Sequence, residues 1–169
     1  MHIRYPMMAL GIIGASLAAN FAFADNLTRE RFVTKASIAN QFEIQSSRLA
    51  LDKAQNQEVK SFAQQMVDDH TKTGEKLNEI LSSSGAGLKP AEELDSKHQK
   101  LMDKLETASD KDFDREYIRI QTDAHKEAVN LFSTYSISGK DSVLKSFAAN
   151  TLPTLEQHLE RVQSLNVDD

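Results

Sequence analysis

Apolar side chains recur at intervals of three and four residues along four long stretches of the chain, the spacing that places them on one face of an α-helix. The stretches cover about residues 28–53, 57–81, 110–135 and 142–165. In the first, the periodic positions are Phe32, Ala36, Ala39, Phe42, Leu49 and Ala50. Sustained two-residue alternation, the signature of a half-buried strand, does not occur. The pattern predicts four amphipathic helices and no sheet.

Short polar breaks separate these stretches. Residues 82–87 (SSSGAG) follow the second stretch with glycines suited to end a helix, and residues 138–141 (SGKD) precede the last. Residues 91–108 form a weaker amphipathic segment, after which Ser109 or Asp110 can cap a new helix by accepting backbone N–H bonds. Pro153 should kink the last helix. We expect an all-α, antiparallel four-helix bundle with an extra short helix before the third long one.

The first 24 residues have the features of a secretory signal peptide. Arg4 precedes an apolar run from about residue 7 to residue 19, and residues 22–24 (AFA) match the small-x-small cleavage pattern. The run is shorter than the roughly 20 residues of a membrane span, so a retained anchor is the weaker alternative. We therefore expect residues 25–169 to form a single domain that is exported to the periplasm, either free or associated with the outer membrane.

Composition narrows the function classes. The formal net charge of -5 argues against nucleic-acid binding through phosphate contacts. The chain has no cysteine, which excludes disulfides, thiolate metal sites and a cysteine nucleophile. No local signature positions a serine for hydrolysis. These observations favour a protein that is not an enzyme.

Polar residues interrupt the apolar stripes at Glu43, His70, His125 and His158, one on each long predicted helix. Imidazole nitrogens and a carboxylate facing one another across a bundle suit zinc, copper, iron or manganese. The alternative is a buried polar cluster in which the histidines form only hydrogen bonds and Glu43 pairs with one of them. His98 also occupies a stripe position, in the weaker segment.

Counting residues from the helix ends tests whether one site is feasible. Glu43 and His70 lie within a few residues of level, roughly 5 Å, whereas His125 and His158 lie about five residues out of step, roughly 7–8 Å. A single four-ligand site then requires a kink or an offset. Asp69 is expected near the solvated face, where it could orient His70.

Several short motifs occur in a characteristic order and spacing: residues 62–70 (FAQQMVDDH), 113–117 (FDREY), 124–125 (AH), 151–155 (TLPTL) and 158–159 (HL). In this order and spacing they resemble an exported bacterial family, domain of unknown function 4142. The resemblance covers about residues 31–165. It implies a ferritin-like four-helix fold and a periplasmic or outer-membrane setting, and it implies no established activity.

The chain departs from ferritin-like di-iron proteins, which use Glu-x-x-His on two helices. Val67, Thr122 and Leu155 stand three residues before the three histidines, and only Glu43 sits where a bridging carboxylate is expected. Di-iron chemistry is therefore disfavoured. The leading hypothesis is an exported, non-enzymatic bundle related to envelope stress, with an envelope protein as its partner. The alternative is a transition-metal protein using Glu43, His70, His125 and His158. The oligomeric state stays open.

Overall fold

The computed structural model describes residues 27–85 and 87–165, and within these ranges it contains five helices and no strand. The helices are α1 (Arg29–Lys53), α2 (Gln57–Ser83), α3 (Ser96–Thr107), α4 (Asp110–Ser138) and α5 (Ser142–Ser164). The predicted all-α class and the extra short helix are confirmed, although α3 begins at Ser96 and not near residue 91. The predicted signal peptide lies outside the described residues.

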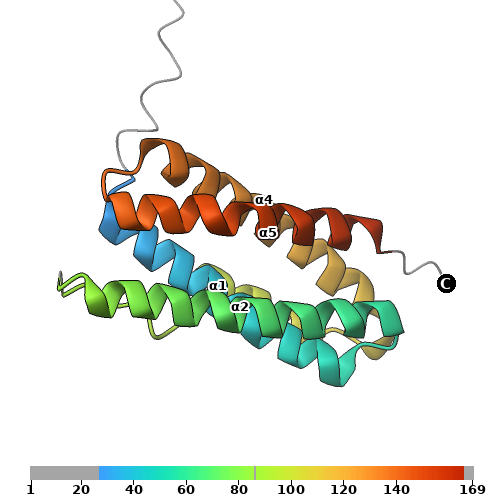
Figure 1. The fold of residues 1–169 in the computed structure, drawn as a ribbon. Helices are drawn as coiled ribbons and strands as arrows, with labels where there is room; N and C mark the ends of the chain where they lie inside the picture. The colour runs from blue at the N-terminus through green and yellow to red at the C-terminus, as the bar shows by residue number, and fades with distance from the viewer. Residues whose placement is uncertain (1–26, 86, 166–169) are drawn as a thin grey trace, which may run out of the picture.

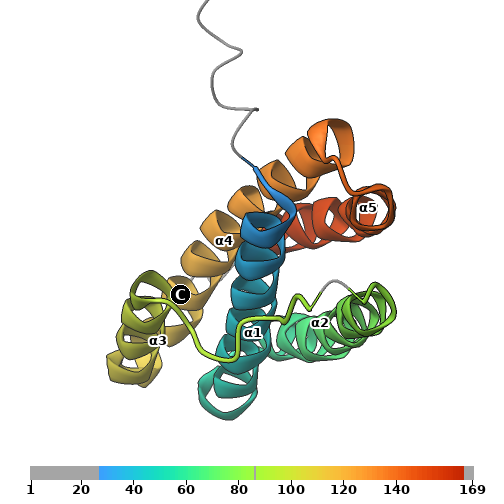
Figure 2. The same cartoon turned by 90° about the vertical axis from the view of Figure 1, so that its left-hand side faces the viewer.

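The long helices form two hairpins that pack across one another (Figure 1). Residues 54–56 join α1 to α2, and residues 139–141 join α4 to α5. Because the connection from α2 to α4 runs the length of the bundle, α2 and α4 point the same way (Figure 1). The contacting pairs α1–α2, α4–α5, α1–α4 and α2–α5 are consequently all antiparallel. The short helix α3 lies against α1 and α4 (Figure 2).

Local sequence sets the helix ends. Asn56 Oδ1 accepts the backbone N–H of Glu58 at 2.7 Å, and Asp141 Oδ1 accepts those of Val143 and Leu144 at 3.0 Å each. The cap predicted at Ser109 is only half right. Ser109 is the N-cap residue of α4, but its hydroxyl donates to Asp112 Oδ2 at 2.7 Å and accepts no backbone N–H.

Glycine and proline occupy special backbone positions after α2 and inside α5. Gly85 and Gly87 have φ of 62° and 66°, the left-handed region that glycine occupies without strain. Pro153 lies inside α5, where it has no N–H to donate to the carbonyl of Ala149. No helix in the described part of the chain is long and apolar enough to cross a membrane.

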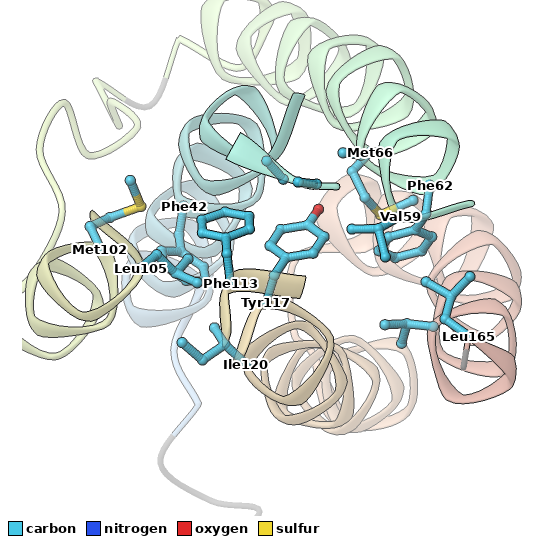
Figure 3. Packing of buried hydrophobic residues seen from close by; sticks show 14 residues of the cluster. Phe42, Val59, Phe62, Met66, Met102, Leu105, Phe113, Tyr117, Ile120 and Leu165 are labelled. Carbon is cyan, nitrogen blue, oxygen red and sulfur yellow. The ribbon is translucent and has the colours of Figure 1, made fainter. Parts of the chain in front are cut away.

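The apolar interior is divided into two clusters at opposite ends of the bundle. One lies toward the α1–α2 turn and contains Phe42, Val59, Phe62, Met66, Phe113 and Tyr117 among others (Figure 3). The other lies toward the α4–α5 turn and contains Phe32, Leu77, Phe132, Tyr135, Leu144 and Phe147 among others. Phe32 stacks on Tyr135 with ring centroids 3.9 Å apart. The middle of the bundle lies between these two clusters.

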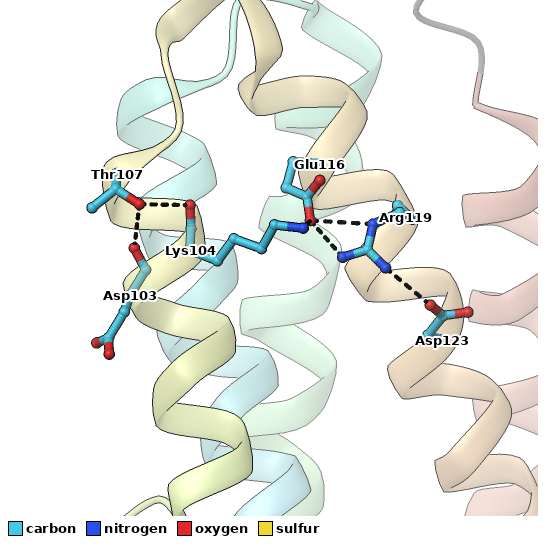
Figure 4. Close-up of polar contacts among 6 residues, drawn as sticks. All are labelled: Asp103, Lys104, Thr107, Glu116, Arg119 and Asp123. Atoms are coloured by element: carbon cyan, nitrogen blue, oxygen red, sulfur yellow. Dashed lines mark hydrogen bonds and ion pairs between the residues drawn. The ribbon is translucent and has the colours of Figure 1, made fainter.

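An exposed ion-pair network links α3 to α4. Glu116 Oε1 lies 2.6 Å from Lys104 Nζ and 2.5 Å from Arg119 Nη2, and Arg119 also approaches Asp123 (Figure 4). Exposed pairs of this kind contribute about 0–1 kcal/mol each. The apolar contacts of Met102 and Leu105, which are 6% and 0% exposed, therefore hold α3 more firmly than its charges do.

Candidate metal centre

A belt of buried polar side chains separates the two apolar clusters. Its members are Glu43, Ser46, Ser47, His70, Gln121, His125 and His158, all between 0% and 5% exposed. Burying so many polar groups is unfavourable unless each gains a partner. The inward placement predicted for Glu43 and the three histidines is confirmed, and each of the four long helices contributes one of them.

The three imidazole rings converge in this belt. Their centroids are 5.8 Å apart for His70 and His125, 5.6 Å for His70 and His158, and 5.6 Å for His125 and His158. One nitrogen of each ring lies within 4.8 Å of one nitrogen of each of the others. Three potential donors from α2, α4 and α5 thus face a common point.

The offset predicted between His125 and His158 does not keep their rings apart, since the ring centroids lie 5.6 Å from each other. Side chains on a helix lean toward its N-terminus, so in the antiparallel pair α4–α5 His125 leans away from the connecting turn and His158 leans toward it. His125 lies nearer the turn along the chain, so the opposite inclinations of the two side chains bring the rings closer together. Residue counting had considered Cα heights alone.

One nitrogen of each histidine ring is held from outside the cluster. His125 Nδ1 donates to the Gln121 carbonyl oxygen at 2.9 Å, and His158 Nε2 donates to Asp69 Oδ2 at 3.1 Å. His70 Nδ1 lies 3.1 Å from Asn40 Oδ1. Carbonyl and carboxylate oxygens only accept, so these contacts fix which nitrogen carries hydrogen in the neutral rings.

The second nitrogen of each ring has no hydrogen-bond partner in the described part of the chain. These atoms are His70 Nε2, His125 Nε2 and His158 Nδ1, and all three are buried. In the tautomers fixed from outside, each presents a lone pair and not an N–H. A cation placed among the three nitrogens would satisfy all of them, and outer hydrogen bonds that orient imidazoles in this way are typical of metal-ligating histidines.

Electrostatics favours the neutral form of His70 and His158. Burial, together with the neighbouring His125 and His158, lowers the pKa of His70 well below 6.5. Burial and His125 also lower the pKa of His158, although the Asp69 carboxylate opposes this shift. Neutral imidazole is the form that ligates metals, so the environment of His70 and His158 favours the ligating state of these two rings.

Glu43 lies beside the histidine cluster and not within it. Its Oε1 is 3.8 Å from His125 Nδ1, the nitrogen that already donates to Gln121, and its Oε2 has no partner among residues 27–85 and 87–165. Burial raises the pKa of the Glu43 carboxyl, while His125 and a hydrogen bond from Gln121 oppose the shift. Glu43 thus lies on the Nδ1 side of the His125 ring, away from the nitrogen that has no partner among the described residues.

Asp69 has a different role from the one expected. It is partly exposed, as predicted, but its carboxylate contacts His158 on α5 and not His70, its neighbour in sequence. Adjacent helical residues point about 100° apart, so Asp69 faces α5 while His70 faces the interior. His98 lies outside the belt, where it bonds to Asp95 and its ring packs 5.1 Å from that of Phe42.

Sequence reasoning missed two members of the site. Asn40 and Gln121 hold His70 and His125, through a side-chain oxygen and a backbone carbonyl respectively. The contact with Gln121 follows from the helix itself, because the carbonyl one turn before His125 is within reach of its ring whatever side chain position 121 carries. Asn40 lies on the half-buried edge of α1, where no apolar period marks it.

Comparisons with known proteins place the chain in a family. The sequence model of "Domain of unknown function (DUF4142)" matches residues 15–165, and the chain therefore belongs to that family. The search of curated proteins found no match.

Three solved structures share the fold. "CopM in the Cu(II)-bound form" has a TM-score of 0.68 at 20% identity, covering 81% of this chain and 94% of that one. "CopM in the Cu(I)-bound form" gives 0.68 at 21% identity with the same coverage. A DUF305 fragment from Deinococcus radiodurans gives 0.63 at 17% identity, covering 80% and 94%. At these identities the likeness establishes a helical-bundle fold and nothing finer.

Proposed function

We propose that this member of the DUF4142 family binds a transition-metal ion through His70, His125 and His158. One observation carries the proposal: three buried imidazoles, held from outside, each keep a nitrogen that has no partner among the residues the structure describes. Buried polar atoms normally find partners, and three that lack them within one cluster point to a shared missing partner.

The dimensions fit a metal after a small adjustment. Metal–imidazole bonds of about 2.0–2.1 Å put the nitrogens of a three-histidine site roughly 3.3–3.6 Å apart. The nitrogens here lie within 4.8 Å, so each must move inward by less than about 1 Å, which ring rotation can supply. Three nitrogen donors without thiolate suit copper, zinc and iron better than magnesium or calcium. Manganese, with its preference for oxygen donors, is the least suited of the four metals considered.

Copper is the first metal to test. Its support is the fold shared with CopM, which has been solved in Cu(I)-bound and Cu(II)-bound forms. Three-coordinate and four-coordinate nitrogen sites also accommodate both copper oxidation states. Glu43 is proposed to orient His125 and to become a fourth ligand only if its carboxylate turns toward the ion.

The setting proposed for this activity is the periplasm, on the evidence of residues 1–24 alone. There, an internal single-ion site suits holding or delivering a metal more than turning over a substrate. An envelope protein that receives the ion is the partner this function requires.

The experiment is metal loading of the purified chain. Cu(I), Cu(II) and Zn(II) are titrated against a competing chelator, in the native chain and in single variants His70→Ala, His125→Ala and His158→Ala. His98→Gln is the matched control, because His98 lies outside the cluster. We expect a stoichiometry of one ion and a loss of at least about 100-fold in affinity for each cluster variant.

The competing hypothesis, a polar core without an ion, gives a different result. It is supported if no metal binds more tightly than about micromolar, or if the cluster variants and His98→Gln bind equally. Metal binding that is retained in all three cluster variants would refute the proposed site at these histidines.

A further inference from the structure

A cavity of about 280 Å³ leads from the surface to the polar belt on the side of α1 and α2. The segment after Gly87, which crosses α1 (Figure 2), contributes Ala91 to the lining. His70 is also a lining residue, whereas His125 and His158 are not. The cavity therefore brings the outside of the molecule up to one ring of the histidine cluster.

The nitrogens of the histidine cluster are closed off from solvent. His70 Nε2, His125 Nε2 and His158 Nδ1 are all buried. An ion that binds these nitrogens must therefore displace a side chain on its way in and again on its way out. His70 borders both spaces, since it belongs to the cluster and lines the cavity. Its ring is the barrier between them.

Polar and apolar side chains line different parts of the cavity. Most of the apolar lining residues are buried and form the inner wall. The polar lining residues that are exposed or half-buried, and so form the outer end, are Asn40, Gln41, Thr73, Asn78 and Glu92. Amide, hydroxyl and carboxylate oxygens there can replace water around an entering cation. None of the described lining residues is a lysine or arginine that would repel it.

A second side of the cluster, toward α5, is closed more firmly. There His158 Nε2 donates to the Asp69 carboxylate, and Lys72 Nζ lies 3.3 Å from the other oxygen of that carboxylate. A hydrogen bond to an ionised group is about twice as strong as one between neutral groups, and the ammonium of Lys72 repels an approaching cation. The contact of His70 Nδ1 with Asn40 Oδ1 joins two neutral groups. His70 is thus the ring that is released more easily.

The surroundings of Asn40 allow this release into the cavity. Asn40 and Gly74 both line the cavity, and a Cβ on Gly74 would lie 2.8 Å from Asn40 Nδ2. The missing Cβ leaves space beside the amide that holds His70. Once that hydrogen bond breaks, the His70 ring can rotate about its Cβ–Cγ bond and turn a nitrogen from the cluster toward the cavity.

We propose that this cavity is the route by which the metal ion enters and leaves, and that the His70 ring is its gate. His70 binds the ion from the cavity side when Asn40 releases it, and its return brings the ion to His125 and His158. The proposal rests on the proposed metal function for its cargo. The opening of His70 toward the cavity, which it also requires, is a property of the metal-free chain.

Chemical modification of the metal-free chain tests the gate without metal. Diethyl pyrocarbonate modifies neutral imidazole nitrogens, and peptide mapping by mass spectrometry gives the initial rate for each histidine. Within the cluster, His70 should react at least about fivefold faster than His125 and His158, because local opening controls access to all three. His98, outside the cluster, is the reference. Equal rates for the three rings, or faster modification of His158, would overturn the gate.

Blocking the outer end of the cavity tests the route. Thr73→Trp places a large ring at a half-buried lining position, and Lys72→Trp places the same ring beside Asp69 as the matched control. Thr73→Trp should slow both Cu(II) association and Cu(II) release to excess EDTA at least about tenfold while Kd stays within about twofold, because a plug raises the barrier equally in both directions. It should slow the modification of His70 as well. Lys72→Trp should leave both Cu(II) rates within about twofold.

The outcomes distinguish failure of the route from failure of the metal site. Asn78→Trp, at an exposed lining position, replaces Thr73→Trp if that variant does not fold. Unchanged Cu(II) rates in the folded plug variant, with Kd intact, would overturn the route and leave the metal site standing. Slowing by Lys72→Trp alone would place the entrance at Asp69. Absence of copper binding by the native chain would refute the metal function and the cargo of the route together.

Discussion

Gly74 offers a sensitive test of how the histidine cluster is held. It lies one turn after His70 inside α2, where glycine normally costs about 1 kcal/mol relative to alanine. A Cβ at this position would lie 2.8 Å from Asn40 Nδ2. The same amide holds His70 Nδ1 through its oxygen at 3.1 Å. Gly74 therefore leaves the room in which Asn40 positions His70.

The expected magnitude follows from two opposing terms. Gly74→Ala gains about 1 kcal/mol of helix propensity, but it displaces the Asn40 amide and loses a hydrogen bond of about 0.5–1.5 kcal/mol. The net change in the free energy of unfolding should therefore be close to zero. In an Asn40→Ala background the obstruction is gone, and Gly74→Ala should stabilise by about the full 1 kcal/mol.

A double-mutant cycle measures this coupling. Urea unfolding of the native chain, both single variants and the double variant should give an interaction energy of about 1 kcal/mol. If Gly74→Ala stabilises the chain equally in both backgrounds, a Cβ at position 74 does not displace Asn40. Gly74 is then not needed for Asn40 to position His70. The single variant Gly74→Ala should also weaken metal binding about tenfold or more, which a purely structural glycine would not do.

Other expectations concern stability. Because His70 and His158 have lowered pKa values, the unfolded chain takes up protons that the folded chain refuses, so the free energy of unfolding should fall as pH drops below about 6.5. This fall in the free energy of unfolding is at most about 1.4 kcal/mol per pH unit for each histidine, and the raised pKa of Glu43 acts in the opposite direction. Denaturation at several pH values should show a smaller fall in His70→Phe and an unchanged fall in His98→Gln. His125→Phe should remove all stabilisation by added metal in thermal unfolding, while His98→Gln keeps it, and retained metal stabilisation in His125→Phe would contradict the place of His125 among the ligands. Asp114→Ala should cost about 1–3 kcal/mol in chemical unfolding, because this buried carboxylate accepts the backbone N–H groups of Gln55 and Asn56 at the α1–α2 turn, whereas Asp110→Ala should stay within about 0.5 kcal/mol.

Periodicity was sufficient to predict the long helices and four residues of the polar belt, since both depend on which face of a helix a side chain occupies. Glu43, His70, His125 and His158 stood out because each interrupts an apolar stripe. Their mutual distances did not follow from the same pattern. Level rings on α4 and α5 depend on the direction of each Cα–Cβ bond, and the contact of Asp69 with His158 depends on how α2 packs against α5. These are properties of two helices together, which one-dimensional spacing does not contain.

The polar belt also selects one alignment of the four helices along the bundle axis. If α2 slid by one turn, about 5.4 Å, so that Met66 took the level of His70, an apolar side chain would lie opposite the other polar groups. Asp69 and Asn40 would lose their imidazole partners in the same movement. Two apolar clusters alone would tolerate such sliding far better, because apolar side chains of similar volume replace one another in a core at little cost. The belt thus favours one register of the helices, before any ligand is bound.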